Sequence, residues 1–121
     1  MASPNQAPIL LVFQSGLTMK ANLMRHLAPR AFSKVVSSLP LRGAMSRRGE
    51  VAVILVNLVA PADKTKSSFD AGEIAYDPRL RAICVTLSRT QGVSMAALGE
   101  IEDKGTLSVV RDRDWVELRL A

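Results

Sequence analysis

The chain has 121 residues, 48% hydrophobic and 22% charged, a globular composition that excludes full-length disorder and collagen-like repeats. One cysteine, Cys84, and one histidine, His26, exclude an internal disulfide and fall short of a zinc site. The net charge is +5, and the longest strongly apolar run, residues 51–60, is interrupted by Asn57 and is only about half of what spans a bilayer, so we expect no membrane span.

The length favours a single domain. We expect residues 9–121 to form it and residues 1–8, which include two prolines, to form a flexible tail. The N-terminus lacks a basic region followed by a long apolar stretch, so we expect no secretory signal and, by default, a cytoplasmic location.

The first predicted element is a β-hairpin. Residues 9–13 form an apolar run, and Gly16 supplies the positive φ that a hairpin turn often requires. Apolar residues then alternate with polar or small ones, which is typical of a strand with one buried face. These alternating residues are Leu17, Met19, Ala21 and Leu23.

From Ala28 the apolar period changes from two to 3.6, which predicts an amphipathic helix of two to three turns. Pro29 fits its first turn and Pro40 ends it. Its apolar stripe consists of Phe32, Val35, Val36 and Leu39.

Strands are predicted over Leu41–Arg47 and Glu50–Leu58, and the second is apolar at nearly every position, which indicates burial on both faces or coverage by the helix. The polar segment 60–68 is the best candidate for a mobile loop. Four segments complete the chain. They are strands at Glu73–Tyr76, Ala82–Leu87, Met95–Ile101 and Trp115–Leu120, and Thr106–Val110 is either a short helix or a strand.

The fold class is therefore mainly β. About eight strands at short spacings favour antiparallel pairing. We expect a closed or nearly closed antiparallel eight-stranded β-barrel, with one main helix capping one end and room for a short second helix.

Catalytic motifs are scarce. The chain has no phosphate loop, dinucleotide fingerprint or Gly-x-Ser-x-Gly elbow. His26 has no nearby carboxylate or nucleophile, and Cys84 lies on an apolar strand, where a thiol most often acts as a small hydrophobe. Glu73 and Asp77 are about 13 Å apart on a strand, too far to share a proton. We therefore predict no catalytic residue, metal site or cofactor.

Arginines and two aromatic residues are the remaining candidates for binding. Strand guanidinium groups can hold carboxylates or phosphates, although a solvated strand face is the more common role. Tyr76 and Trp115 occupy regular strand positions, which favours core packing over a pocket. The candidate arginines are Arg42, Arg47, Arg79 and Arg81.

Two segments resemble the small prokaryotic cyclophilin-like proteins, which are related in fold to peptidyl-prolyl isomerases. Residues 27–43 are similar to the helix entry after the first hairpin of that family. Residues 69–78, Phe-Asp-Ala-Gly-Glu-Ile-Ala-Tyr-Asp-Pro, with Ala-Ile-Cys at 82–84, look like its Gly-acid-Ile-Ala/Gly-Tyr-x-Pro segment and the strand that follows. The resemblance implies an eight-stranded barrel with helical ends.

The isomerases of that family use a Phe-His-Arg strand motif and a Gln-Gly-Gly segment, and neither occurs here. The resemblance therefore implies binding of a peptide segment or a small anionic ligand in a surface groove without efficient catalysis. Arg42 and Arg47, with Tyr76 at the margin, are the predicted ligand contacts. The alternative is a weak prolyl isomerase in which Arg47 polarises the amide nitrogen.

The charge distribution raises a second alternative. Residues 1–49 hold seven basic side chains and no carboxylate, and such a one-sided positive potential can attract nucleic acid. Only 4% of the residues are aromatic, so the stacking surfaces usual in nucleic-acid binders are missing. A homodimer formed through exposed strand edges is a further expectation.

Overall fold

The computed structural model describes residues 5–61 and 63–121. Within these residues the chain forms nine strands, one α-helix and two short 3₁₀ helices. The strands are β1 (Gln6–Phe13), β2 (Thr18–Met24), β3 (Leu41–Arg48), β4 (Val51–Leu55), β5 (Lys66–Phe69), β6 (Glu73–Asp77), β7 (Ala82–Thr86), β8 (Thr90–Ile101) and β9 (Asp114–Leu120). The helical segments are η1 (Arg25–Leu27), α1 (Pro29–Ser38) and η2 (Lys104–Val109).

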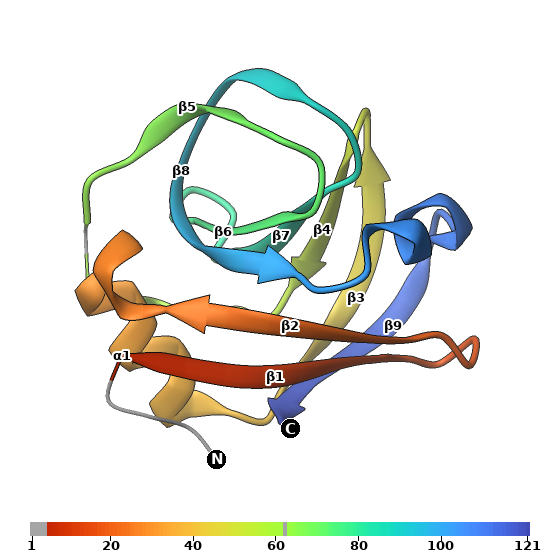
Figure 1. Ribbon diagram of the computed structural model, residues 1–121, viewed down its shortest axis with the longest axis horizontal. Helices are drawn as coiled ribbons and strands as arrows, with labels where there is room; N and C mark the ends of the chain where they lie inside the picture. The colour runs from red at the N-terminus through yellow and green to blue at the C-terminus, as the bar shows by residue number, and fades with distance from the viewer. Residues whose placement is uncertain (1–4, 62) are drawn as a thin grey trace.

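Eight of these strands close into an antiparallel barrel (Figure 1). Around the ring the order is β2, β1, β9, β3, β4, β7, β6 and β8, and β2 pairs with β8 to complete it. Strand β5 pairs with β8 and lies outside the ring. The prediction of a closed antiparallel eight-stranded barrel is confirmed.

The first hairpin is also confirmed, but it begins earlier than predicted. Strand β1 starts at Gln6, which pairs with Met24. Residues 6–8 therefore belong to the sheet and not to the predicted tail, because Ala7 is buried at the start of the alternation. Residues 1–4 of that tail lie outside the described residues.

Helix α1 packs on the barrel interior, as the apolar stripe predicts. Phe32 and Val35 are buried, and Val36 and Leu39 pack at the edge of the same cluster. The helix N-terminus is capped from a distant loop: a carboxylate oxygen of Asp63 accepts a hydrogen bond of 2.6 Å from the backbone N–H of Ala31. A carboxylate there also favours the helix dipole.

Alternation along the strands separates two apolar clusters. The interior cluster fills the barrel and includes Ala52 and Ile54 of β4. The outer cluster lies against the opposite face of the same wall, where the intervening Val51 and Val53 are found. The predicted burial of this segment on both faces is thus confirmed, although β4 ends at Leu55 and not at Leu58.

The cover on the outer face comes from β5 and from β8, not from the helix. Figure 1 shows these two strands curving together away from the ring. Phe69 of β5 and Met95 of β8 are buried in the outer cluster with Val51 and Val53. Residues 66–68, predicted as part of a mobile loop, are therefore strand, with a single buried side chain at Phe69 that is too weak a signal to detect.

Strand β8 is also longer than predicted, since it begins at Thr90 instead of Met95. Gly92, whose φ of 79° suggested a break, lies within it. Its first part pairs with β5, and its later part with β6 and β2. The ambiguous segment near residue 106 is helical, within η2.

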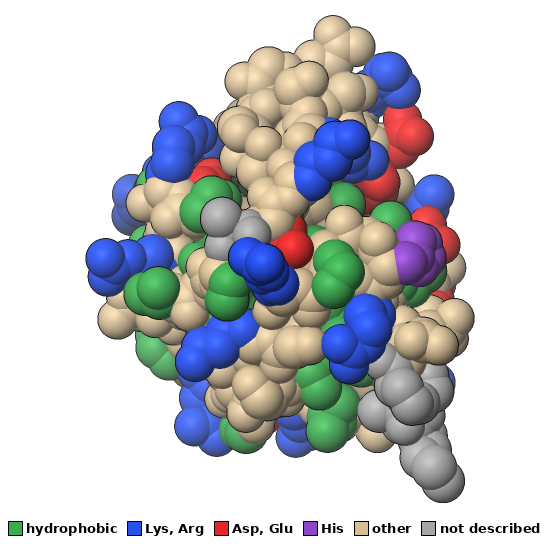
Figure 2. All heavy atoms as spheres, turned by 90° about the vertical axis from the view of Figure 1, so that its left-hand side faces the viewer, with side chains coloured by type: hydrophobic (Ala, Val, Ile, Leu, Met, Phe, Trp, Pro, Cys, Tyr) green, Lys and Arg blue, Asp and Glu red, His purple; other side chains and the backbone are tan. Residues whose placement is uncertain are grey.

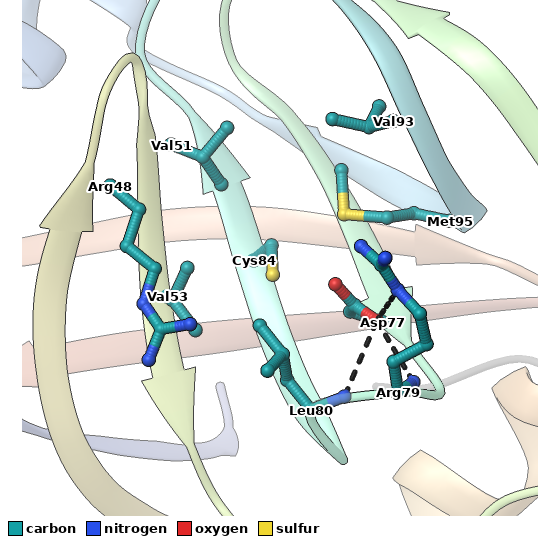
Figure 3. A pocket seen from close by; sticks show the side chains of 9 residues that line it. All are labelled: Arg48, Val51, Val53, Asp77, Arg79, Leu80, Cys84, Val93 and Met95. Atoms are coloured by element: carbon teal, nitrogen blue, oxygen red, sulfur yellow. Dashed lines mark hydrogen bonds and ion pairs between the residues drawn. The ribbon is translucent and has the colours of Figure 1, made fainter.

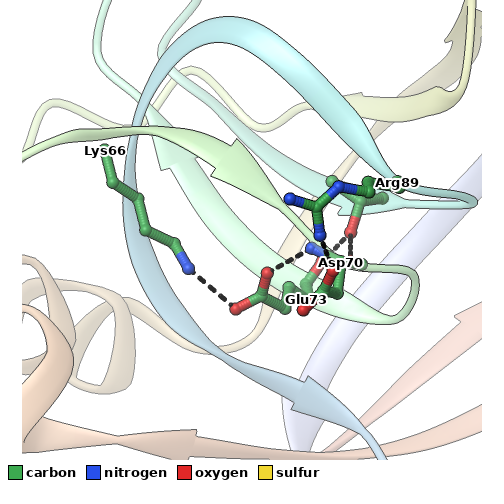
Figure 4. A network of polar contacts seen from close by, with 5 residues as sticks. Lys66, Asp70, Glu73 and Arg89 are labelled. Atoms are coloured by element: carbon green, nitrogen blue, oxygen red, sulfur yellow. Dashed lines mark hydrogen bonds and ion pairs between the residues drawn. The ribbon is translucent and has the colours of Figure 1, made fainter.

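A polar network joins the ends of β5, β6 and β7 (Figure 4). Lys66 Nζ lies 3.0 Å from Glu73 Oε1, and Arg89 Nη1 lies 2.7 Å from Asp70 Oδ1. The hydroxyl of Thr86 donates to the backbone oxygens of Asp70 and Glu73. Exposed ion pairs of this kind each contribute less than about 1 kcal/mol, so their main effect is to fix the turn between β5 and β6.

None of the helices in the described part of the chain has the length and apolar character required to cross a membrane.

Candidate ligand-binding site

A hollow of about 400 Å³ lies between the outer face of the barrel wall and the curved strand β8 (Figure 3). This volume is within the usual range for small-molecule sites. Most of its lining is apolar, with three charged side chains at its sides. The lining residues are Arg48, Val51, Val53, Asp77, Arg79, Leu80, Cys84, Val93 and Met95.

Asp77 is the buried polar group of the hollow, with 4% of its surface exposed. Its Oδ1 accepts hydrogen bonds from the backbone N–H groups of Arg79 at 2.9 Å and Leu80 at 3.4 Å. These bonds hold the turn after β6 and fix the carboxylate. In Figure 3 the second carboxylate oxygen points away from the turn, towards the side of Cys84 and Met95.

Two guanidinium groups flank the hollow from opposite sides. Arg79 is next to Asp77, with Nε 3.8 Å from Oδ1, and its side chain is 75% exposed. Arg48, at the end of β3, stands on the other side beyond Val53 (Figure 3). A ligand in the hollow would thus meet positive charge on two sides and one carboxylate.

Cys84 lies at the centre of the hollow but is not a nucleophile. Burial raises the pKa of its thiol to about 12, with a smaller upward contribution from Asp77 and a downward one from Arg48. A thiol with this pKa stays protonated near neutral pH. Cys84 therefore acts as part of the apolar floor, as predicted for a thiol on a buried strand.

We expect Cys84 to resist alkylation by iodoacetamide. A pKa near 12 instead of 9.0 lowers the thiolate fraction at pH 8 about a thousand-fold in the folded state. Mass spectrometry should show slow labelling of native protein and rapid labelling in urea. Because folding holds the thiol proton more tightly, stability should also fall as pH rises above about 9. Rapid labelling without denaturant would contradict this description of the thiol.

The two arginines predicted as ligand contacts lie elsewhere on β3. Arg42 Nε is 2.6 Å from Glu117 Oε2, its partner across the β3–β9 ladder. Arg47 Nη2 is 3.9 Å from Glu50 Oε2, and neither arginine lines the hollow. Their role as ligand contacts stays a prediction.

Tyr76, the third predicted contact, is 3% exposed and belongs to the interior cluster. Its hydroxyl donates a hydrogen bond of 2.6 Å to the backbone oxygen of Leu58 and accepts one of 3.1 Å from the N–H of Ala60. The predicted core packing of Tyr76 is confirmed. That of Trp115 is wrong, because Val116 and Leu118 point inward and leave Trp115 47% exposed on the outer face.

We expect Tyr76→Phe to lower the free energy of unfolding by about 1–2 kcal/mol, since it leaves two backbone groups of the 56–61 loop without their partner. The ring itself still fills its place. Urea denaturation measures the loss, and hydrogen exchange should show it as faster opening of that loop. Unchanged stability would mean that water replaces the hydroxyl at no cost.

Sequence reasoning had singled out Asp77 and Arg79 but had not joined them to Arg48. A signal was present, since Arg48 precedes the glycine of the β3–β4 turn and pairs with Val51, which has the same outward orientation as Val53. What was missing was the return of β8 over this face. Among the described residues, no group of three or more His, Cys, Asp or Glu side chains could hold a metal ion.

A second, more open hollow lies along α1. It is lined by Arg25, Arg30 and Lys34 with serines and prolines. Figure 2 shows this side of the molecule, where basic side chains are scattered and acidic ones lie between some of them. The basic first part of the sequence therefore does not form one continuous positive patch on this face.

Comparisons with known proteins identify the fold alone. No protein-family model and no curated protein matches the chain. A hypothetical protein from Archaeoglobus fulgidus is similar in structure, with a TM-score of 0.73 and 19% identity over 96% of this chain and 95% of that one. The structure of McbB in complex with tryptophan has a TM-score of 0.74 and 16% identity, covering 92% of this chain but 44% of that one.

Proposed function

We propose that this chain is a ligand-binding barrel that holds a small anionic molecule, or a peptide segment with an anionic group, in the hollow beside β8, without efficient catalysis. The observation that carries the proposal is an apolar hollow flanked by Arg48 and Arg79. Guanidinium groups bind carboxylates and phosphates with two parallel hydrogen bonds, and apolar walls take up the rest of a ligand.

Two further observations support binding in preference to covalent chemistry. The thiol at the centre of the hollow has its pKa raised to about 12, so it is a poor nucleophile. McbB, one of the similar barrels, was solved with tryptophan bound. That structure is consistent with small-molecule binding by a barrel of this kind.

The test is an NMR titration of labelled protein with 3-phenylpropionate, a carboxylate with an apolar body. We expect shifts at Val51, Val53 and Val93 with a Kd in the millimolar range or below. Arg79→Gln should weaken binding about tenfold, the typical effect of losing a charged hydrogen bond. Arg42→Gln is the matched control outside the hollow and should change little.

The absence of any shift at these valines at millimolar ligand would refute binding in the hollow. Loss of affinity in Arg42→Gln or Arg47→Gln, with Arg79→Gln unaffected, would return the site to the arginines predicted from the sequence.

The cyclophilin-like relationship belongs to this proposal, since the similar structures establish a barrel and nothing finer. A weak prolyl isomerase is the first alternative: acceleration of Xaa-Pro isomerisation that disappears in Arg47→Ala would support it. Electrostatic nucleic-acid binding is the second, and it requires affinity that falls steeply with the logarithm of salt concentration. The scattered charge along α1 gives the second alternative no support.

A further inference from the structure

We propose that the ligand of the hollow is a free α-amino acid with an apolar side chain, whose ammonium group binds Asp77 and whose carboxylate binds Arg79. This inference rests on the proposed function and names its ligand class. It starts from a feature that an anionic ligand alone leaves unused, namely the carboxylate of Asp77 in the lining.

Asp77 is oriented for a positively charged donor. One of its oxygens is occupied by the backbone N–H groups of Arg79 and Leu80, and those bonds prevent the side chain from turning away. The other oxygen points towards the hollow (Figure 3). A buried carboxylate needs a donor at each oxygen, and an ammonium group satisfies it better than a neutral group because the hydrogen bond is charge-assisted.

Arg79 places the opposite charge directly beside this carboxylate. Its Nε lies 3.8 Å from Asp77 Oδ1, while most of the side chain is exposed and free to turn onto a ligand. An α-amino acid carries its ammonium and carboxylate on one carbon, so its two charges are also adjacent. Each would meet the opposite charge of the protein, which is the complementarity that selects among ligands.

The rest of the lining selects the side chain of the ligand. Beyond the two charged residues, the hollow is bounded by Val51, Val53, Val93 and Met95. Cys84 adds an uncharged thiol to this surface, since its pKa is raised well above neutral pH. A ligand with a charged side chain would lose hydration here without a partner, with the exception of an acid that reaches Arg48.

The experiment compares four ligands on the native protein by calorimetry or NMR. They are L-phenylalanine, 3-phenylpropionate without the ammonium group, 2-phenylethylamine without the carboxylate, and L-phenylalaninamide, which mimics the N-terminal residue of a peptide. We expect L-phenylalanine to bind at least tenfold more tightly than each of the other three, with shifts at Val51, Val53 and Val93.

A conservative variant tests the assignment of the ammonium site. Asp77→Asn keeps an oxygen to accept from the turn N–H groups but removes the charge, so it should weaken L-phenylalanine at least tenfold and leave 3-phenylpropionate unchanged or tighter. Glu102→Gln, an exposed change of the same charge, is the matched control and should have no effect. If Asp77→Asn does not fold, the comparison of the four ligands on the native protein still decides the question.

The outcomes separate this inference from the proposed function. If 3-phenylpropionate binds as tightly as L-phenylalanine, the hollow is an anion site and the amino-acid inference is wrong. If L-phenylalaninamide binds as tightly, the ligand is the N-terminus of a peptide and the inference is also wrong. If none of the four ligands shifts the hollow residues, both proposals fail.

Discussion

Gly99→Ala is expected to destabilise the barrel by about 3 kcal/mol or to prevent it from closing, which is the upper part of the range for overpacking. Gly99 pairs with Leu23 where β8 meets β2, the pairing that closes the ring. A Cβ at this position would overlap the backbone oxygen of Asn22 and would lie 2.8 Å from the Cα of Leu23. Backbone atoms cannot yield as the end of a flexible side chain can, so the two strands must separate.

Urea denaturation measures the loss, and hydrogen exchange should place it first at the β2–β8 pairing. Glu100→Ala, an exposed change on the same strand, should remain within about 0.5 kcal/mol of the parent. A second seam offers an independent comparison, since a Cβ at Gly43 would overlap the backbone oxygen of Leu55. Parent-like stability of Gly99→Ala would show that the strands pair less closely than described.

Phe69→Ala is expected to release β5 and the first part of β8 from the barrel wall while the ring stays closed. Phe69 is 1% exposed, and its ring is the large side chain with which β5 contributes to the outer cluster. Lys66 Nζ also lies 4.6 Å from the centre of this ring. Truncating a buried phenylalanine costs about 3–5 kcal/mol.

The functional consequence is the loss of the hollow, because Val93 and Met95 of β8 line it. Phe32→Ala is the matched control: it removes a ring of equal size that is 2% exposed in the interior cluster. Both variants should lose comparable stability, but only Phe69→Ala should lose hydrogen-exchange protection at residues 90–95 and affinity for 3-phenylpropionate. Equal loss of affinity in both variants would show that the hollow depends on global stability and not on β5.

The candidate site depends on one connection that the sequence obscures. The arginines favoured from the sequence, Arg42 and Arg47, were chosen because strand guanidinium groups can bind anions, and the structure places acidic residues beside both. Arg48 and Asp77 are far apart in the chain and meet across the strands β4, β7 and β6. No local pattern marks such a pairing, because it depends on which strands are neighbours.

The sequence by itself determined the barrel and its main helix, because each is written in a local period. Alternation over residues 17–23 and 115–120 assigns inward and outward faces, and the 3.6-residue stripe from Phe32 to Leu39 assigns a helix between two prolines. The doubly apolar pattern of β4 also indicated correctly that this strand is covered on both sides.

Only the tertiary structure decided what covers that strand and what binds beside it. Strand β5 has a single buried side chain and β8 contains a glycine with positive φ, so neither shows a clear period in the segment that folds over the wall. The cap of α1 is likewise supplied by Asp63, which lies 32 residues after Ala31. Long-range pairing of this kind is selected by the combined packing of the whole chain, and a local window of sequence does not contain that information.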